Sequence, residues 1–386
     1  MIVAPRLLMP LGALVITLLV AALGLGFEDV RPVTAAAEQT VQPATRADYL
    51  RAASAATRRS SAWWDKRRHW YLEQLGGPGK YPLATLWGVV HLFEAKNALA
   101  IAAPTPARKA AVRAFARGAE RYWNPNLRPV PGYGPYPDSR GRRDRTWYDD
   151  NGWWGIAFHD AYRATGDARY LASAKRALMF LDSGWDRRKG GIWWETTHSF
   201  KAGESLAGGT LLAALLYQET HSPKYLAIAR KYVNWADRDF RGEDGLYDRH
   251  EHDDTPMPYV QGPMFNAFAV LCGSTHNLGY CREAEELADR AANRFPKLTM
   301  GPQYDAMYIR ALLELYRIDH NARWYGIAKA EVDRAMTNAP VPNGLYLRNW
   351  DGGPMSAIGG SKPNALQTHA ATTSVIAWMA AAQPPR

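Results

Sequence analysis

The sequence predicts an all-α protein, an (α/α)6 barrel of six helical hairpins. From Ala47 onward, apolar residues recur every three or four positions, as they do on one face of a helix, and long β-branched runs typical of strands are missing. Twelve segments follow this pattern, and part of it repeats along the chain. A repeated hairpin buries its apolar face only against its neighbours, so a closed double ring is expected, with an open solenoid as the structural alternative.

The helical pattern places the elements in chain order with clear gaps between them. The predicted helices cover residues 46–74, 83–101, 107–123, 152–164, 168–183, 204–220, 223–237, 262–275, 280–295, 302–317, 321–336 and 367–382. The repeat is clearest between "TGDARYLASAKRALMFL" from Thr165 and "THSPKYLAIARKYVNWA" from Thr220, with weaker copies from Leu278 and Asn321. Each copy reads as a helix end, a tight turn and a second helix.

The connections between the predicted helices are of two kinds. Those within a hairpin are short and polar, such as "ATGD" at 164–167 and "ETHS" at 219–222. Those between hairpins are long and rich in Gly and aromatic residues, and they cover residues 129–150, 184–205, 241–262 and 343–369. Long loops of this kind usually carry function, and in a ring of hairpins they all emerge at one end. That end is the predicted site.

The first 37 residues differ from the rest of the chain. Arg6 precedes an apolar run from Leu7 to Phe27, and Ala35 and Ala37 stand as in a small-residue cleavage site. We expect a signal peptide that is removed after Ala37, although the run is also long enough to be an uncleaved membrane anchor. Residues 38–386 would then be a single barrel domain, secreted or anchored on the outer side of the cytoplasmic membrane.

The charge of the sequence indicates which binding partners to expect, and its two cysteines indicate a disulfide. The formal net charge is +10, which predisposes an exported protein to meet an anionic envelope surface or an acidic glycolipid. The basic residues are scattered except for "RGRRDR" at 140–145, so nucleic acid is not an expected partner. Cys272 and Cys281 predict a disulfide, with two buried free thiols as the alternative. Zinc spacings, a phosphate-binding loop and a G-x-S-x-G elbow are missing from the sequence.

Aromatic residues gather in the long loops. They include Trp147, Tyr148, Trp153, Trp154, Trp193, Trp194, Tyr247, Tyr259, Tyr346 and Trp350. An aromatic face can stack on the apolar face of a sugar ring, while the polar edges of Tyr and Trp donate hydrogen bonds. Any single Trp could instead fill the core. Clustered with Gly, Asp and Asn, they indicate a carbohydrate-binding groove.

Two adjacent carboxylates, Asp149 and Asp150, stand in "TWYDDNGWW" at a helix start. Asp and Asn commonly cap helices there, but one cap needs only one acceptor. A second carboxylate beside the first adds repulsion, which should raise the pKa of one of them. Retaining glycosidases use two carboxyl groups about 5 Å apart, one as nucleophile and one as acid/base. Neighbours in a first helical turn can reach one pocket in this way.

The run "WYDDNGWWGIAFHDAYRATGDARYL" resembles the signature of glycoside hydrolase family 76, the endo-α-1,6-mannanases. The resemblance continues in "GGIWWETTHSFKAGESLAGG", "GLYDRHEHDD" and "YDAMYIRALLEL", and it spans about residues 46–382. It implies an (α/α)6 barrel, a retaining reaction with Asp149 as nucleophile and Asp150 as general acid/base, and no metal or organic cofactor. The chain keeps Lys201 and Ser205 of the family's K-N-A-I-S-N pattern but has Leu206 at its end, and Val260 opens its version of N-Q-G. These departures bear on which sugars the flanking subsites accept.

Further polar and aromatic residues of the loops are candidate substrate-binding groups. They are Tyr148, Asn151, Trp193, Trp194, Asp248, Gln261, Asp305, Arg310 and Trp350. Asp248 could instead form a salt bridge, and Asn151 and Gln261 could instead cap helices or bond to loops. Asp305 and Arg310 are five residues apart, so a salt bridge between them is not expected. His250, His252 and His369 lack paired metal-ligand spacing, so we expect no metal site.

These observations together predict an exported, monomeric retaining glycoside hydrolase. Its substrate would be α-1,6-linked mannan or a mannosylated envelope glycolipid. One alternative is a cell-wall transglycosidase that passes the mannosyl unit to another sugar. A second alternative, from a different class, is a carbohydrate-binding barrel without catalysis.

Overall fold

The computed structural model describes residues 44–77, 81–140, 144–355 and 364–385. The predicted signal peptide or anchor at 1–37 lies outside these residues. Among the described helices, none combines the length and apolar character needed to cross a membrane.

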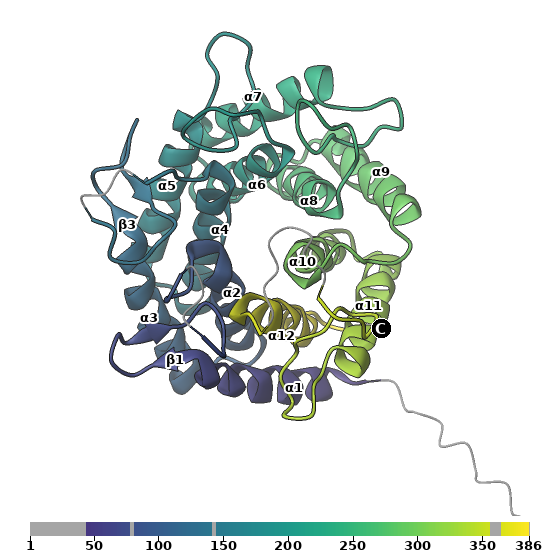
Figure 1. Ribbon diagram of the computed structural model, residues 1–386. Coiled ribbons are helices and arrows are strands. Elements are labelled where there is room, and N and C mark those ends of the chain that lie inside the picture. The colour runs from purple at the N-terminus through teal and green to yellow at the C-terminus, as the bar shows by residue number, and fades with distance from the viewer. Residues whose placement is uncertain (1–43, 78–80, 141–143, 356–363, 386) are drawn as a thin grey trace, which may run out of the picture. The chain divides into compact units, whose positions relative to one another are not determined.

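Twelve α helices account for most of the described residues. They are α1 (Arg46–Arg59), α2 (Leu86–Ala102), α3 (Pro106–Ala119), α4 (Tyr148–Thr165), α5 (Ala168–Ser183), α6 (Gly203–Thr220), α7 (Pro223–Asp239), α8 (Pro258–Thr275), α9 (Leu278–Arg294), α10 (Pro302–Asp319), α11 (Ala322–Asn338) and α12 (Leu366–Ala381). Figure 1 shows them as two concentric rings, with the even-numbered helices inside and the odd-numbered helices outside.

The two rings differ in how their helices are buried. In α12, every residue from Leu366 to Ala380 is buried, as expected for a helix that is surrounded by protein on all sides. In α9 the buried residues are Ala284, Leu287, Ala288 and Ala291, a spacing that gives one apolar stripe facing the inner ring. The inner helices therefore form the core, and the outer helices cover it.

The inner ring is closed by contact between its first helix, α2, and its last helix, α12. Each inner helix contacts the next from α2 round to α12, and α12 packs extensively against α2. The first outer helix, α1, packs against α12 in turn. The predicted (α/α)6 barrel is thus confirmed over the open solenoid.

The short turns inside the hairpins share one construction. Four inner helices end at a residue with left-handed backbone, namely Gly166, His221, His276 and His320. In three of the turns the following Asp or Asn caps the outer helix, accepting from a backbone N–H two residues later at 2.8–3.1 Å. This shared turn is the physical basis of the sequence repeat.

Three predicted helix boundaries are wrong in ways that matter for the site. The helix predicted over 46–74 ends at Arg59, and a 3-10 turn (Ser60–Trp63) and a small hairpin of β1 (Trp64–Asp65) and β2 (Trp70–Tyr71) follow. Asp65 accepts from two backbone N–H groups of the intervening turn, which favours the turn over a helix. A second hairpin pairs β3 (Trp123–Asn124) with β4 (Gly132–Tyr133).

The helices predicted from 152 and 262 both begin four residues earlier, at Tyr148 and Pro258. Proline suits a first helical position because its missing N–H would have no partner there. The earlier start of α4 places the Asp pair inside its first turn.

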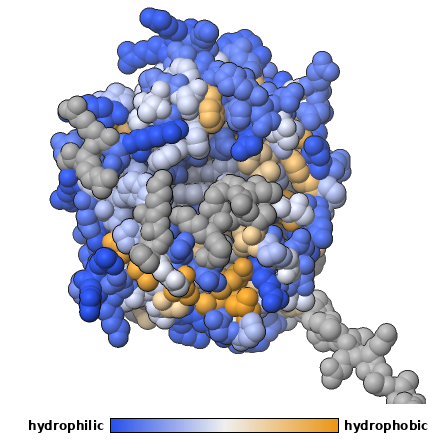
Figure 2. All heavy atoms as spheres, in the orientation of Figure 1, coloured by the Kyte–Doolittle hydropathy of each residue, from blue (hydrophilic) through white to orange (hydrophobic). Residues whose placement is uncertain are grey.

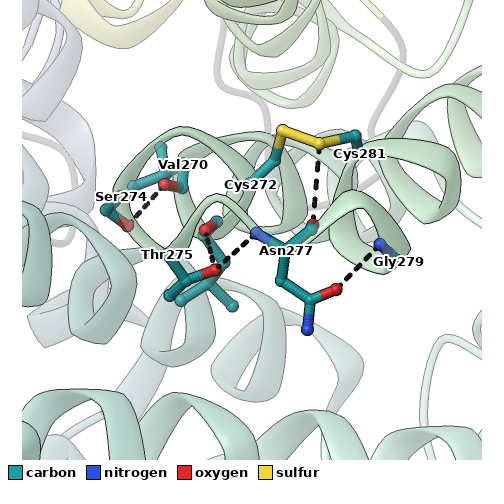
Figure 3. Close-up of a disulfide and its surroundings, with 8 residues drawn as sticks. Val270, Cys272, Ser274, Thr275, Asn277, Gly279 and Cys281 are labelled. Atoms are coloured by element: carbon teal, nitrogen blue, oxygen red, sulfur yellow. Dashed lines mark hydrogen bonds between the residues drawn. A yellow bond between two sulfur atoms is a disulfide. The ribbon is translucent and has the colours of Figure 1, made fainter.

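The two cysteines join neighbouring helices of one hairpin. Cys272 near the end of α8 and Cys281 in the first turn of α9 form a disulfide with an S–S distance of 2.08 Å (Figure 3). The bridge spans the turn at Asn277, where it links the inner helix to its outer partner.

Candidate active site

The N-termini of all six inner helices lie at the same end of the barrel. Each inner helix is followed by a short turn and an antiparallel outer helix, and a long loop then returns the chain to that end (Figure 1). Figure 2 shows this face, which is hollowed near the centre of the ring. Because a helix N-terminus carries partial positive charge, six of them together favour carboxylates.

Asp149 and Asp150 are the second and third residues of α4. Asp149 is 8% exposed, the Trp194 side chain hydrogen-bonds to its carboxyl group, and its Oδ1 has no hydrogen-bond partner among the described residues. Burial raises the pKa of Asp149 to about 7. Burial, the charge of Asp149 and the charge of Glu73 raise the pKa of Asp150 well above its usual value. The two carboxyl groups therefore interact.

The order of the two ionisations separates their chemical roles. Burial first and the negative charge of Asp149 second raise the pKa of Asp150, and a carboxyl group beside a charged one holds its proton more tightly. A charged carboxylate beside a protonated one is the pairing that a nucleophile and a general acid require.

Two further carboxyl groups lie in this part of the ring, and sequence reasoning did not select either as a site residue. Glu204 is in the first turn of α6, and burial followed by the charge of Asp149 raises its pKa to about 8. The Glu73 carboxyl, in the loop before α2, accepts from the Thr85 backbone N–H at 2.6 Å, where α2 begins. An acidic residue in the first turn after a long loop was the available signal for Glu204, since Asp149 stands the same way.

An aromatic cluster from four inner helices surrounds these carboxyl groups. The Tyr259 ring of α8 lies with its centroid 5.0 Å from Trp153 of α4, 5.6 Å from Trp87 of α2 and 5.3 Å from Tyr304 of α10. After burial, the charges of Asp149, Glu204 and Asp150 are the main causes that raise the pKa of Tyr259. The cluster thus adjoins the acidic groups and offers both flat apolar faces and hydroxyl groups to a sugar.

A cleft of about 520 Å³ is lined in part by Tyr81, Tyr136, Arg145 and Trp147, the residue that precedes α4. The Arg145 guanidinium is 5.4 Å from the Trp147 ring centroid and 5.7 Å from that of Trp194, and it also pairs with Glu195 at 3.2 Å. These contacts hold the two indole rings next to Asp149. Trp194, a predicted substrate-binding residue, is therefore at the site.

Two other predicted substrate-binding residues, Tyr148 and Trp193, pack away from Asp149. Tyr148 is fully buried with its ring 5.1 Å from Phe180 of the outer helix α5, so it is part of the core rather than of the groove. Trp193 stacks on His198 at 5.1 Å, and the Lys201 ammonium lies 5.4 Å from its ring. Adjacent residues of extended chain face opposite sides, so Trp194 lies beside Asp149 while Trp193 packs away from it.

Asn151 and Gln261 bind loop backbone instead of substrate. The Asn151 amide accepts from the Tyr133 N–H at 2.9 Å and donates to the Tyr133 carbonyl at 2.9 Å. The Gln261 amide does the same with Tyr247, at 2.9 and 2.7 Å. Both amides are fully buried and both of their polar ends are occupied. The alternative of loop bonding is the correct one for these two residues.

The remaining predicted binding residues also have structural partners. Asp248 faces Asp244, Asp253 and Asp254 of its own loop, whose charges follow burial in raising its pKa. Asp305 is 2% exposed and accepts from the Gly301 N–H at 3.0 Å. Asp248 thus lies among the acidic residues of its loop, and Asp305 bonds the loop residue that precedes α10.

Arg310 and Trp350 are both buried inside the barrel. Arg310 bridges Glu94 and Asp160, each at 2.8 Å, so three inner helices meet at one guanidinium group. The Trp350 indole is 2% exposed and donates to Thr372 at 3.0 Å. Both predicted binding residues thus have hydrogen-bond partners inside the barrel.

No group of three or more potential metal-ligating side chains occurs within the described part of the chain. His369, one of the histidines considered above, instead accepts from the Tyr346 N–H at 3.0 Å, and its second ring nitrogen lies 3.0 Å from the Ala56 carbonyl.

A family model matches the central part of the chain. The model for glycosyl hydrolase family 76 matches residues 131–308, which include the Asp pair and the helices from α4 to the start of α10. The search of curated protein sequences gives no match.

Several solved structures share the fold. A family 76 α-mannanase from Bacteroides thetaiotaomicron has 21% identity and a TM-score of 0.76, over 88% of this chain and 96% of that chain. An inactive variant of an α-1,6-mannanase from Salegentibacter, with two consecutive aspartates replaced by asparagine and α-1,6-mannotriose bound, has 16% identity and a TM-score of 0.70, over 86% and 99%. Dfg5 from Chaetomium thermophilum, in complex with glucosamine, has 13% identity and a TM-score of 0.69, over 90% and 94%.

At these identities the structural similarity establishes the fold, and the family model carries the assignment. The resemblance seen in the sequence is confirmed: residues 131–308 match the glycosyl hydrolase family 76 model, and the fold is shared with family 76 α-mannanases.

Proposed function

We propose that this protein is a retaining glycoside hydrolase that cleaves α-1,6-mannosidic linkages. The observation that carries the proposal is the adjacent pair Asp149 and Asp150, whose pKa values are both raised by burial, with that of Asp150 raised further by the charge of Asp149. The Salegentibacter α-1,6-mannanase supports it, because the inactive variant of that protein has two consecutive aspartates replaced.

In the proposed first step, the Asp149 carboxylate attacks C1 of the sugar and forms an ester bond, while the C1–O bond to the leaving sugar breaks. Asp150 gives its proton to the leaving oxygen. In the second step Asp150 takes a proton from water, the water oxygen bonds to C1, and the ester bond to Asp149 breaks. Two displacements at C1 return the original anomeric configuration, and both carboxyl groups regain their starting states.

The aromatic cluster and the N-terminal helix ends support this chemistry. Trp87, Trp153, Tyr259 and Tyr304 would stack on and hydrogen-bond the sugar bound at the Asp pair, while the Trp194 side chain keeps Asp149 in place. The substrate would be linear mannan or a mannosylated glycolipid outside the cytoplasm, and the net charge of +10 would favour an anionic envelope.

The test is incubation of the protein with linear α-1,6-mannan while new reducing ends are counted. We expect cleavage by the wild type and at least about a thousandfold lower rates for Asp149→Asn and for Asp150→Asn, because each removes a group that acts at C1. Asp254→Asn, on an exposed loop residue, is the matched control.

Product lengths separate hydrolysis from its nearest alternative. Shorter oligosaccharides alone support hydrolysis, whereas products longer than a defined α-1,6-mannooligosaccharide starting material indicate a transglycosidase. Equal rates for the wild type and both Asp variants would refute the proposed mechanism.

A further inference from the structure

Glu204 is a third carboxyl group, near enough to Asp149 for the charge of Asp149 to raise its pKa, and the double displacement does not use it. Its side chain is 13% exposed, and its Oε2 is buried without a hydrogen-bond partner among the described residues. Buried polar atoms in folded proteins nearly always have a partner, so such an atom next to an active site calls for an explanation. A bound substrate would supply one.

The groups around Glu204 come from four elements. Asp149 of α4, Tyr259 of α8 and Tyr304 of α10 all interact electrostatically with it. The fourth element is the loop before α8, which contributes Arg249 and Asp253.

Arg249 offsets the charge of Glu204 only in part. Its Nε is 3.9 Å from Glu204 Oε1, beyond hydrogen-bond distance, and its Nη1 is 3.3 Å from Asp253. The closest cation is thus shared with another carboxylate at the rim, and Glu204 Oε2 stays on the buried side.

This setting favours the protonated form of Glu204. Burial and the charge of Asp149 raise the pKa of Glu204 to about 8. A protonated Glu204 is a hydrogen-bond donor, and the carboxylate form of Asp149 is an acceptor. A sugar hydroxyl both donates and accepts, so one hydroxyl can bind both groups.

We propose that Glu204 is a further substrate-binding residue of this site, whose carboxylic acid donates a hydrogen bond to a hydroxyl of the sugar that Asp149 attacks. The inference rests on the proposed function and extends it to a residue of α6. The two buried oxygens without partners, Asp149 Oδ1 and Glu204 Oε2, are the atoms that such a hydroxyl would satisfy.

The proposal has a pH signature that a merely structural role would lack. As pH rises through about 8, wild-type Glu204 loses its donor and places a second negative charge beside Asp149. The amide of Glu204→Gln keeps a donor at every pH and adds no charge. The variant should therefore retain activity at neutral pH and lose less of it in alkaline solution than the wild type.

The experiment measures kcat/KM for an α-1,6-linked mannotetraose across pH in the wild type, Glu204→Gln, Glu204→Ala and the control Glu243→Gln, whose residue is exposed. We expect Glu204→Ala to lose about tenfold at neutral pH, and Glu204→Gln to stay within about threefold there, as for the loss and the exchange of one hydrogen bond. The alkaline limb of Glu204→Gln should move to higher pH, while the control should follow the wild type.

Binding provides a second measurement that folding defects do not mimic. The dissociation constant of the tetrasaccharide is measured by tryptophan fluorescence in Asp150→Asn and in Asp150→Asn with Glu204→Ala. The second variant should bind about tenfold more weakly, while its circular dichroism and melting curve stay those of the first.

The two proposals fail in different ways. If the wild type cleaves mannan while Glu204→Ala matches it in kcat/KM and binding, or the pH profile of Glu204→Gln overlays that of the wild type, the assignment of Glu204 is wrong and the proposed function stands. If the wild type neither cleaves nor binds the tetrasaccharide, the proposed function itself is wrong.

Discussion

At the scale of single residues, the site is built from carboxyl groups held where water is scarce. Asp149, Asp150 and Glu204 all stand in first helical turns, where the helix dipole favours negative charge, yet burial raises the pKa of each. Burial is the largest cause for all three, so desolvation outweighs the dipole. A folded protein that keeps such groups gives up stability for chemistry.

Because burying the Asp149 carboxylate lowers stability, we expect a mutation that removes its charge to stabilise the protein. The pKa of Asp149 rises from its ordinary 3.8 to about 7 on folding, so the folded state resists losing this proton. Asp149 therefore destabilises the folded state least below pH 3.8. The free energy of unfolding falls as the pH rises from 3.8 to about 7. Asp149→Asn removes the ionisation, so its melting temperature should exceed that of the wild type above pH 7, and the gain should shrink towards pH 4.

Calorimetric melting curves over this pH range check the prediction. Glu286→Gln, at an exposed residue, should show no pH-dependent gain. A melting temperature for Asp149→Asn at or below that of the wild type throughout would mean that burial does not strain this carboxyl group.

At the scale of elements, the fourth residue of four inner helices fastens the loop that precedes it. Asn151 of α4 and Gln261 of α8 each clamp a tyrosine backbone through both ends of an amide, and His369 of α12 accepts from the Tyr346 N–H. Asp305 of α10 accepts from Gly301. Loops that carry function are the mobile parts of most folds, and these bonds hold the long loops against the rigid ring.

Removing one clamp should therefore loosen a loop and cost stability. Gln261→Ala leaves the Tyr247 N–H and carbonyl buried without partners, and we expect unfolding free energy to fall by about 1–3 kcal/mol. Urea denaturation measures it, with Gln383→Ala at an exposed position as the control. A loss no larger than that of the control would show that water replaces the amide at no cost.

At the scale of the whole molecule, a buried ionic network ties the inner ring together. Arg310 of α10 bridges Glu94 of α2 and Asp160 of α4, and its guanidinium is 4.8 Å from the Trp378 ring of α12. Helices that are distant in sequence thus meet through one side chain. A buried ion pair adds little stability compared with apolar side chains of similar size. Removing one partner, however, leaves a buried charge without its counterion.

Arg310→Ala should destabilise the barrel by about 3–5 kcal/mol, because two buried carboxylates lose their cation. Denaturation followed by far-ultraviolet circular dichroism gives the value, and Arg187→Ala, at an exposed residue, should change it little. Adding Glu94→Gln and Asp160→Asn to Arg310→Ala should restore part of the loss. No restoration would indicate that packing of the Arg310 side chain, rather than charge, is what matters.

The sequence by itself determined the elements whose signals are local. Helical periodicity, the short capped turns and the spacing of the repeat depend on neighbours in the chain, so they predicted twelve helices and a closed barrel. The Asp pair and Trp194 were likewise predicted, because each lies in a short motif of consecutive residues. The first helix was drawn too long at 46–74 because periodicity alone does not register a turn that Asp65 stabilises.

Only the tertiary structure decided which polar residues reach the pocket. Asn151, Gln261, Asp305, Arg310 and Trp350 have the composition of ligands, yet each is occupied by a partner 4 to 216 residues away. Tyr259 and Glu204 reach the pocket because helices from separate hairpins converge there. Burial and pairing across the ring arise from packing between distant segments, and a linear pattern does not encode which side of a helix faces which neighbour.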